Sequence, residues 1–255
     1  MRTKKLERDQ LTLCVPVTDQ KQEDIVAQIL DLTARKTEAI EWRIDHFEKG
    51  DQAESILALL EEIQPFLTDT ILILTYRSER EGGCGRLSRA EYEKLLRKIA
   101  VSESIDYLDY EIMDAADAFA AVKEFHDLGV RVIASNHHFE GTPDEMEMVR
   151  ILEHMILADA DIAKIAVMPK SLSDTMRLLY ASAMVKEKYP EQALITIAMG
   201  AEGAVTRLIG EVTGSCLSFV TQGRASAPGQ MSYEAVEKAR EAIHLCLTEG
   251  EKNEP

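Results

Sequence analysis

"DIAKIAVM", residues 161–168, is a run of small and β-branched apolar residues with a lysine at its centre. A short apolar run between longer amphipathic stretches is typical of a strand buried on both faces, as in a parallel sheet. Lys164 conflicts with that environment, because an ammonium leaves water at a cost of several kcal/mol unless it gains a partner or loses its proton. The stretch therefore predicts a buried strand that carries a titratable amine.

Similar short runs recur along the chain and alternate with helical patterns. Apolar residues in the intervening segments are three or four positions apart, as at Ile25, Ile29 and Leu32. The expected strands are 11–17, 39–45, 71–77, 107–112, 130–137, 161–168, 193–199 and 215–221. Eight strands alternating with eight helices in 255 residues is the count of a (β/α)₈ TIM barrel. We predict one such barrel, a single domain over residues 1–255.

An open doubly wound sheet is the alternative fold, and it should carry a glycine-rich phosphate turn after an early strand. "EGGCGR" (81–86) follows the third expected strand but matches neither G-x-G-x-x-G nor the P-loop pattern. A flexible loop at the end of a barrel strand is the better interpretation of this segment.

Composition narrows the classes of partner. The formal net charge of -16 disfavours nucleic acid and anionic membranes, and no apolar run reaches the roughly 18 residues of a membrane span. The four cysteines, Cys14, Cys84, Cys216 and Cys246, lie far apart and form no C-x-x-C pair, so we predict neither a zinc site nor a disulfide framework. We expect a cytoplasmic protein whose partner is a small molecule.

Helix ends are marked by short motifs. Ser88 to Glu91 and Thr142 to Glu145 have the spacing of capping boxes, which predict helix starts at these positions. Gly129 and Gly250 fall where helices are expected to stop.

Polar residues cluster at the carboxyl ends of the expected strands, where barrel enzymes carry their active sites. Glu41, Arg43 and Asp45 are two residues apart and should point to one face of a strand. Further charged or titratable side chains follow other strands: Arg77, Glu81, Asn136, His137, His138 and Arg207, with "SAPGQ" (226–230) after the last. Each alone could be a solvated rim charge or a satisfied hydrogen-bonding group, but their coincidence at one end of the barrel indicates an active site.

A lysine suits such a site because its neutral amine can attack a ketone. Burial, or neighbouring cations such as Arg43, Arg77 and Arg207, would disfavour the ammonium and lower the pKa of the lysine, which leaves the neutral amine. The iminium that forms withdraws electrons, so a nearby imidazole can remove a proton from the adjacent carbon. The residues therefore indicate a Schiff-base barrel that needs neither a metal nor an organic cofactor.

Seven segments resemble, in order and spacing, the sequence blocks of type I 3-dehydroquinate dehydratase. They are "EWRID" (41–45), "TYRSEREGG" (75–83), "SNHHF" (135–139), "KIAVMP" (164–169), "TIAMG" (196–200), "TRLIGEVTGS" (206–215) and "ASAPGQ" (225–230). The resemblance covers about residues 11–245. It implies a homodimeric hydro-lyase that converts 3-dehydroquinate to 3-dehydroshikimate and water, the third step of the shikimate pathway.

The resemblance also implies roles for individual residues. Lys164 would form the imine, His137 would act as base and then acid in a syn elimination, and Glu81 would orient His137. The substrate carboxylate would bind Arg207. Glu41, Arg43 and Arg77 would hold the ring hydroxyls, and Ser226 and Gln230 would close over the substrate from the loop after the last strand.

Two features depart from the family pattern. His138 stands where the family usually has aspartate after the catalytic histidine, and the segment before the first strand is short, so little chain is expected to cover the bottom of the barrel. Two other functions stay open at this point: another Schiff-base barrel, such as a class I aldolase, and a metabolite-binding barrel without catalysis.

Overall fold

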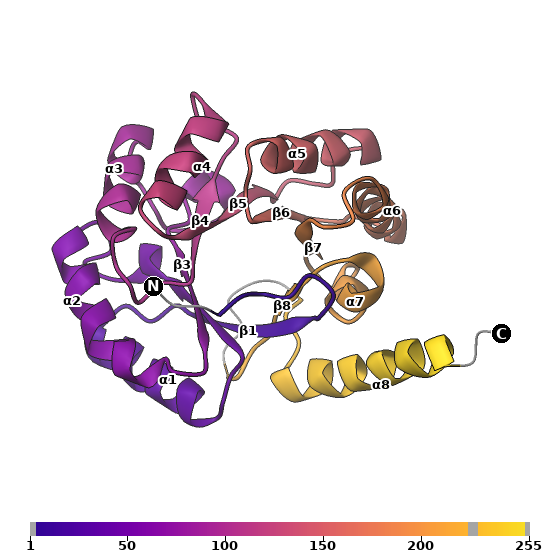
Figure 1. Cartoon of the computed structure of the whole chain (residues 1–255), viewed down its shortest axis with the longest axis horizontal. Helices are drawn as coiled ribbons and strands as arrows, with labels where there is room; N and C mark the ends of the chain where they lie inside the picture. The colour runs from indigo at the N-terminus through magenta and orange to yellow at the C-terminus, as the bar shows by residue number, and fades with distance from the viewer. Residues whose placement is uncertain (1–3, 224–228, 253–255) are drawn as a thin grey trace.

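The computed structural model describes residues 4–223 and 229–252. Its eight strands form one sheet in the order β7-β6-β5-β4-β3-β2-β1-β8, in which all paired neighbours are parallel, and helices surround the strands (Figure 1). A bridge between Leu194 of β7 and Ser215, just before β8, brings the two ends of the sheet together. The structure confirms the predicted (β/α)₈ barrel and excludes the open doubly wound sheet.

Strands and helices alternate along the chain. The strands are β1 (Thr12–Val17), β2 (Ala39–Arg43), β3 (Ile71–Thr75), β4 (Tyr107–Glu111), β5 (Arg131–His138), β6 (Ile162–Val167), β7 (Ala193–Ala198) and β8 (Leu217–Phe219). The α-helices are α1 (Gln22–Ala34), α2 (Ala53–Ile63), α3 (Arg89–Ile99), α4 (Ala118–Asp127), α5 (Glu145–Leu157), α6 (Leu172–Lys188), α7 (Gly210–Thr213) and α8 (Tyr233–Lys252). Within the described ranges, no helix combines the length and apolar character needed to cross a bilayer.

Three strands end two residues earlier than the sequence predicts. β2 stops at Arg43, where the 3₁₀ turn η1 (Ile44–His46) begins; β3 stops at Thr75, shortly before the 3₁₀ turn η3 (Glu79–Glu81); and β8 stops at Phe219. In each case the chain leaves the parallel ladder at the mouth of the barrel. The residues beyond each strand end are therefore free to bend toward the pocket.

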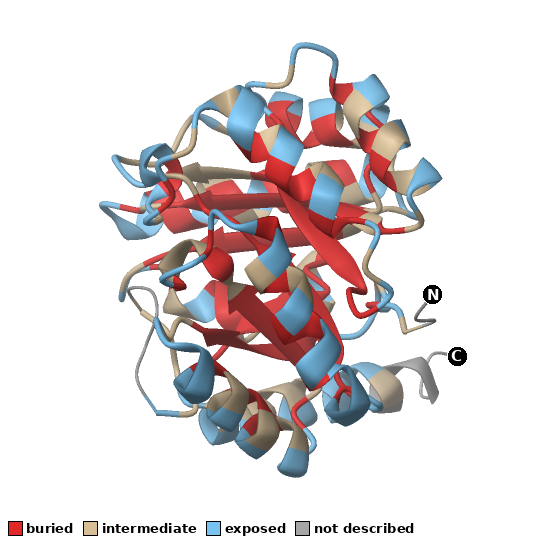
Figure 2. Ribbon diagram, turned by 90° about the vertical axis from the view of Figure 1, so that its left-hand side faces the viewer, coloured by how far each residue is buried: buried red, intermediate tan, exposed pale blue. Residues whose placement is uncertain are grey.

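Two apolar layers enclose the strands, most of whose residues are buried, as the largely red strands in Figure 2 show. One layer fills the barrel interior and includes Cys14, Ile73, Ile133, Ile195 and Phe219. The other packs the strands against the helices and includes Leu13, Trp42, Leu74, Leu108 and Val167. Alternate residues of a strand thus serve the two layers, which explains why these strands read as nearly continuous apolar runs.

The helix-end motifs were predicted with mixed success. Ser88 forms the expected capping box with Glu91, and Gly129, at a φ of +88°, follows the end of α4. The cap of α5 is Asp144, not Thr142: its side chain accepts a hydrogen bond from the Glu147 N–H at 2.8 Å. Gly250 lies inside α8, because one glycine costs a helix only about 1 kcal/mol and does not by itself end it.

The short N-terminal segment does reach across the bottom of the barrel. Leu6 is buried within the barrel-interior layer, and its N–H donates to the Tyr107 hydroxyl at 3.0 Å. The Arg131 guanidinium donates to the Lys4 carbonyl at 2.7 Å. A few residues are therefore enough to cover this end, contrary to the expectation from the segment's length.

Candidate active site

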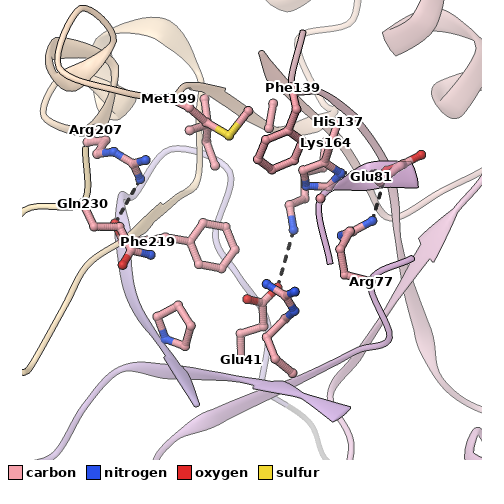
Figure 3. A pocket seen from close by; sticks show the side chains of 15 residues that line it. Glu41, Arg77, Glu81, His137, Phe139, Lys164, Met199, Arg207, Phe219 and Gln230 are labelled. Carbon is pink, nitrogen blue, oxygen red and sulfur yellow. Dashed lines mark hydrogen bonds and ion pairs between the residues drawn. The ribbon is translucent and has the colours of Figure 1, made fainter. Parts of the chain in front are cut away.

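A pocket of about 180 Å³ opens at the carboxyl ends of the strands. It contains eight of the nine predicted site residues, all except Ser226 (Figure 3). The lining residues are Pro16, Glu41, Arg43, Arg77, Glu81, Gly82, His137, Phe139, Lys164, Ala166, Ile197, Met199, Arg207, Phe219 and Gln230. Ser226 lies outside the described residues. The size of the pocket suits a small metabolite and not a polymer.

Lys164 lies on β6 with 3% of its surface exposed, and its side chain points into the pocket (Figure 3). Its ammonium nitrogen donates to Asp109 Oδ2 at 2.8 Å and lies 3.6 Å from Glu41 Oε1. The Phe219 ring is 4.8 Å away on another side. The sequence offered two environments for this amine, burial or neighbouring cations: Lys164 is buried, and the charged groups in direct contact with it are carboxylates.

Arg77 connects the two halves of the site. Its guanidinium donates to Asp109 at 2.7 Å, to Glu111 at 3.0 Å and to Glu81 at 3.2 Å. It is therefore the centre of a buried ion-pair network that links the carboxylate beside the lysine with the carboxylate beside the histidine. A single guanidinium fixes both carboxylates in place, because its donors form a rigid planar fork.

Asp109 and Glu111 are the residues that the sequence analysis missed. Both lie on β4 and are buried, and the Ser135 hydroxyl donates to Asp109 at 2.6 Å. Burial alone would raise the pKa of Asp109, but the Arg77 and Lys164 cations hold it at about 2. The signal in the sequence is "YLDYE" (107–111), where the two acids share one strand face with Tyr107.

His137 forms a pair with Glu81, in which the ring Nδ1 lies 2.8 Å from Glu81 Oε2. Burial raises the pKa of Glu81 to about 7, although the Arg77 cation opposes this. Burial, followed by the Arg77 and Lys164 cations, lowers the pKa of His137 well below its usual range. The imidazole is therefore neutral near pH 7 and is oriented by a carboxylate at one nitrogen, as a general base requires.

His138 does not line this pocket. It borders an adjoining hollow, which His137 and Phe139 also line, and as the next residue along β5 its side chain points to the opposite side from His137. Burial lowers the pKa of this imidazole too. The strand register thus directs His137, and not its neighbour, to the lysine.

The turn that carries Glu81 needs a glycine. Gly82 follows the 3₁₀ turn η3 with a φ of +79°, and a Cβ atom there would lie 2.1 Å from the Phe139 ring. The ring packs directly over the turn and lines the pocket beside Glu81. This packing helps to fix the Glu81 carboxylate against His137.

Arg43 is held at the rim by Asp45. Its Nε and Nη2 donate to the two oxygens of the Asp45 carboxylate, each at 2.8 Å. Asp45 lies in η1, so the predicted strand position was wrong; the carboxylate turns back to clamp Arg43 and also accepts the backbone N–H groups of Arg77 and Cys84. Asp45 thereby ties together the ends of two neighbouring strands.

Arg207 and Gln230 lie side by side across the pocket from His137 (Figure 3). Arg207 ends the 3₁₀ turn η4 (Ala204–Arg207), is 3% exposed, and donates to the Phe219 carbonyl at 3.2 Å. Burial lowers the pKa of Arg207 to about 10. A cation disfavoured by burial gains stability from an anionic ligand, so this wall of the pocket suits a carboxylate.

Barrels of this fold carry their active sites where this pocket lies, and its groups suit proton transfer on a small anionic molecule. The fold and the pocket therefore define a barrel enzyme. The sequence of this chain matches the family model for type I 3-dehydroquinase over residues 13–246. The chain belongs to the type I 3-dehydroquinase family, and hence to the hydro-lyases.

Curated relatives agree with this family over almost their whole length. The chain is 39% identical over 234 residues to a 3-dehydroquinate dehydratase of Klebsiella pneumoniae, covering 91% of this chain and 92% of the relative. It is 35% identical over 233 residues to a 3-dehydroquinate dehydratase of Clostridium botulinum, with the same shares covered.

Solved structures agree as well. The 3-dehydroquinate dehydratase of Geobacillus kaustophilus superposes with a TM-score of 0.88 at 31% identity, covering 92% of each chain. The type I 3-dehydroquinate dehydratase of Clostridium difficile, solved with covalent modified comenic acid, has a TM-score of 0.88 at 33% identity and covers 93% of this chain and 94% of its own.

Proposed function

We propose that this chain catalyses the syn dehydration of 3-dehydroquinate to 3-dehydroshikimate through a Schiff base on Lys164. One observation carries the proposal: a buried lysine and a carboxylate-oriented imidazole line the same small pocket. Membership of the type I 3-dehydroquinase family supplies the substrate. The same membership supports the proposal that this reaction is the third step of the shikimate pathway.

In the first stage the substrate ketone is joined to the lysine. The Lys164 amine, after losing its proton, attacks C3 of the substrate, and the carbinolamine loses water to give an iminium. His137 is neutral, because burial and nearby cations hold its pKa well below its usual range, so it can accept the proton that the amine must lose and return it to the carbinolamine hydroxyl, which leaves as water.

In the second stage the iminium withdraws electrons and acidifies the hydrogens at C2. His137 removes one of these protons and then delivers a proton to the departing C1 hydroxyl, which leaves as water. Water then hydrolyses the conjugated iminium to release 3-dehydroshikimate and the free Lys164 amine. The net change is the loss of one water molecule, and Glu81 keeps the imidazole oriented at Nδ1 throughout.

Substrate binding uses the remaining wall of the pocket. Arg207 is proposed to hold the carboxylate, a role supported by its burial and its planar pair of donors. Glu41 and Arg43 are proposed to hold ring hydroxyls, and Gln230 and Ser226 to close over the substrate. Arg77 has three carboxylate partners already, which favours a positioning role over its predicted contact with a ring hydroxyl.

Covalent chemistry has a parallel in the Clostridium difficile structure, which contains covalent modified comenic acid. The two other functions are less well supported. The matched family is not one of aldolases, and a binding barrel would have no use for an imidazole–carboxylate pair beside a buried lysine.

The direct test is turnover of purified protein with 3-dehydroquinate, followed through the ultraviolet absorbance of the conjugated ketone product. We expect activity in the wild type and in Lys170→Ala, because Lys170 is exposed beyond the end of β6. Lys164→Met should be inactive while its far-ultraviolet circular dichroism stays native. A fully active Lys164→Met variant would refute the proposal.

A further inference from the structure

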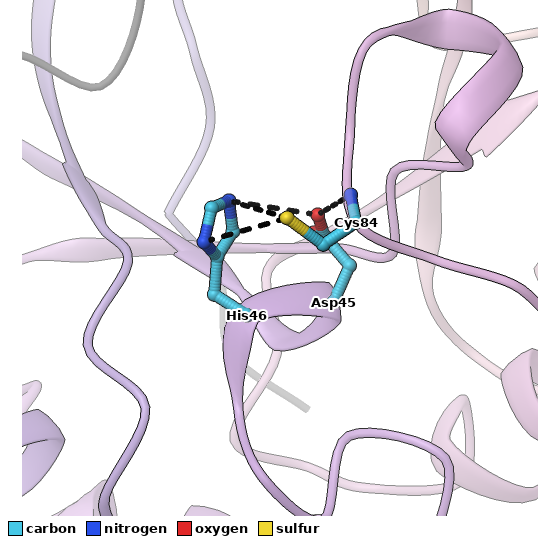
Figure 4. A group of neighbouring side chains, drawn as sticks. All are labelled: Asp45, His46 and Cys84. Carbon is cyan, nitrogen blue, oxygen red and sulfur yellow. Dashed lines mark hydrogen bonds and ion pairs between the residues drawn. The ribbon is translucent and has the colours of Figure 1, made fainter.

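Three side chains outside the proposed catalytic set meet at the rim of the pocket. Asp45 and His46 lie in η1 after β2, whereas Cys84 lies in the loop after β3, and Figure 4 shows the three directed toward one point. In the described part of the chain, one potential ligand atom from each lies within 4.8 Å of the other two. Cys84 is exposed and His46 is partly exposed, so solvent reaches the group.

The separations of these atoms approach those of a tetrahedral metal site. Metal–ligand bonds of about 2.3 Å to sulfur and about 2.0–2.1 Å to nitrogen or oxygen place sulfur and nitrogen about 3.6 Å apart, and nitrogen and oxygen about 3.4 Å apart. Cys84 Sγ lies 3.8 Å from His46 Nε2, and the same nitrogen lies 3.7 Å from Asp45 Oδ2. Shifts of a few tenths of an ångström would bring these two pairs to the tetrahedral separations, and the third pair, Cys84 Sγ and an Asp45 carboxylate oxygen, lies within 4.8 Å.

The chemistry of the donors selects the kind of ion. One thiolate, one imidazole and one carboxylate suit a borderline-soft divalent ion such as Zn²⁺, whereas Mg²⁺ and Ca²⁺ require oxygen ligands. Three protein ligands leave the fourth position to water. The thiol of Cys84 would release its proton to solvent on coordination.

A resident cation already occupies part of this space. Arg43 Nη2 lies 2.8 Å from Asp45 Oδ2 and 3.4 Å from His46 Nε2, between the same two atoms that would bind the ion. The Asp45 carboxylate accepts four hydrogen bonds, two of them from Arg43, so its lone pairs are fully used. An ion can therefore bind Asp45 only if a donor leaves, and the Arg43 guanidinium is the donor that lies in its place.

We propose that Asp45, His46 and Cys84 bind a thiophilic divalent cation such as Zn²⁺ in exchange for the Arg43 guanidinium. Because Arg43 also lines the catalytic pocket, the ion would weaken substrate binding and act as an inhibitor. The binding site itself is independent of the proposed function, and only this kinetic consequence rests on it.

Cobalt provides a probe of the site that does not depend on activity. Zn²⁺ is spectroscopically silent, but Co²⁺ bound to a thiolate gives a charge-transfer absorption. Titration of the reduced protein with Co²⁺ should produce this band, and Zn²⁺ should abolish it. Cys84→Ser should lack the band, and His46→Ala should bind either ion at least tenfold more weakly. Cys246 is the other exposed cysteine and lies on α8, so Cys246→Ser should behave as wild type.

The kinetic arm measures KM for 3-dehydroquinate with and without Zn²⁺. We expect Zn²⁺ to raise KM in the wild type and in Cys246→Ser but not in Cys84→Ser, whose activity without metal should be unchanged. A cobalt band that persists in Cys84→Ser, or equal affinity in His46→Ala, would overturn the site. Binding at the site with an unchanged KM would overturn the exchange with Arg43. If the enzyme does not turn over 3-dehydroquinate, the cobalt titration still decides whether the site exists.

Discussion

At the scale of single residues, two adjacent imidazoles have different surroundings. His137 pairs with Glu81 and lines the pocket, whereas His138 borders only the adjoining hollow. Because successive strand side chains point to opposite sides, only one of the two is expected to face the substrate from a regular strand end, and the family resemblance selects His137. Its catalytic role stays a prediction, and substitution of each histidine can test it.

His137→Ala should lower kcat by at least 10²–10⁴-fold, because positioned proton transfer contributes about that much to each step. Lys164 remains in this variant, so a covalent imine should still form slowly and accumulate. His138→Ala should keep most of its activity. The measurement is steady-state kinetics together with mass spectrometry of the intact protein. The opposite pattern, with His138→Ala inactive and His137→Ala mild, would move the catalytic assignment by one residue.

The Glu81–His137 pair should control the acidic side of the pH–rate profile. Only an ionised Glu81 holds the imidazole proton of His137 on Nδ1, because a neutral carboxyl can donate its own proton to that nitrogen, and burial has raised the pKa of Glu81 to about 7. We therefore expect kcat/KM to fall as the pH decreases through about 7. The lowered pKa of His137 places its own protonation at more acidic pH. Glu81→Gln should have a lower plateau without this limb, and a profile identical to wild type would exclude Glu81 as its origin.

Arg207 tests where the substrate carboxylate binds. Arg207→Lys keeps the positive charge but loses the planar pair of donors, so KM should rise by about tenfold to a hundredfold, which corresponds to the roughly 1.5–3 kcal/mol of a charged hydrogen bond. Arg177→Lys on α6, whose partly exposed side chain pairs with Asp174 outside the pocket, is the matched control and should leave KM unchanged. An unaltered KM in Arg207→Lys would show that the carboxylate binds elsewhere.

At the scale of elements, a layer of charges inside the barrel joins four neighbouring strands. Asp109 on β4 binds Lys164 on β6, Ser135 on β5 and Arg77 just after β3. The two cations stay buried because this carboxylate compensates them. A buried group of ion pairs adds little net stability to the fold, because the cost of taking the charges out of water offsets their attraction. Removal of one charge is nevertheless destabilising, since it leaves its buried partners unpaired.

Asp109→Ala should therefore lower the free energy of unfolding by about 3–5 kcal/mol at pH 7, measured by urea denaturation. The pKa of Asp109 is depressed to about 2 in the folded state, so its contribution to the free energy of unfolding is complete at any pH above the ordinary pKa of aspartate and is lost as the pH falls through about 2. The difference in stability between wild type and Asp109→Ala should therefore shrink in acid. Asp69→Ala, at an exposed site, should change stability by less than about 0.5 kcal/mol, and an equally small effect in Asp109→Ala would contradict the network.

The ends of elements were harder to predict from the sequence than their number. Apolar runs identified all eight strands. Asp45 was nevertheless assigned to a strand that ends two residues earlier, because the alternation of polar residues continues from Arg43 to Asp45 and gives no sign that the turn η1 begins there. Asp109 and Glu111 were missed for a related reason. In "YLDYE" they alternate with Leu108 and Tyr110, and this alternation alone does not tell which face of the strand lines the barrel interior.

At the scale of the whole molecule, the barrel was predictable because each βα unit has its own local pattern, and eight such units permit closure. Contacts between units were not predictable in this way. Asp45, His46 and Cys84 are brought together by the pairing of β2 with β3, so their spacing in the sequence gave no sign of the proposed metal site. The oligomeric state likewise stays a prediction, because a homodimer was expected from the family resemblance alone.

The central claim is that the barrel directs one buried lysine to a ketone, and borohydride trapping tests it most directly. The protein is incubated with 3-dehydroquinate, reduced with sodium borohydride, digested, and mapped by mass spectrometry. We expect one covalent adduct, on Lys164, because this amine lines the pocket beside His137, whereas Lys170 is exposed beyond the strand end. An adduct on Lys170, or no adduct under conditions in which the substrate is consumed, would contradict the account.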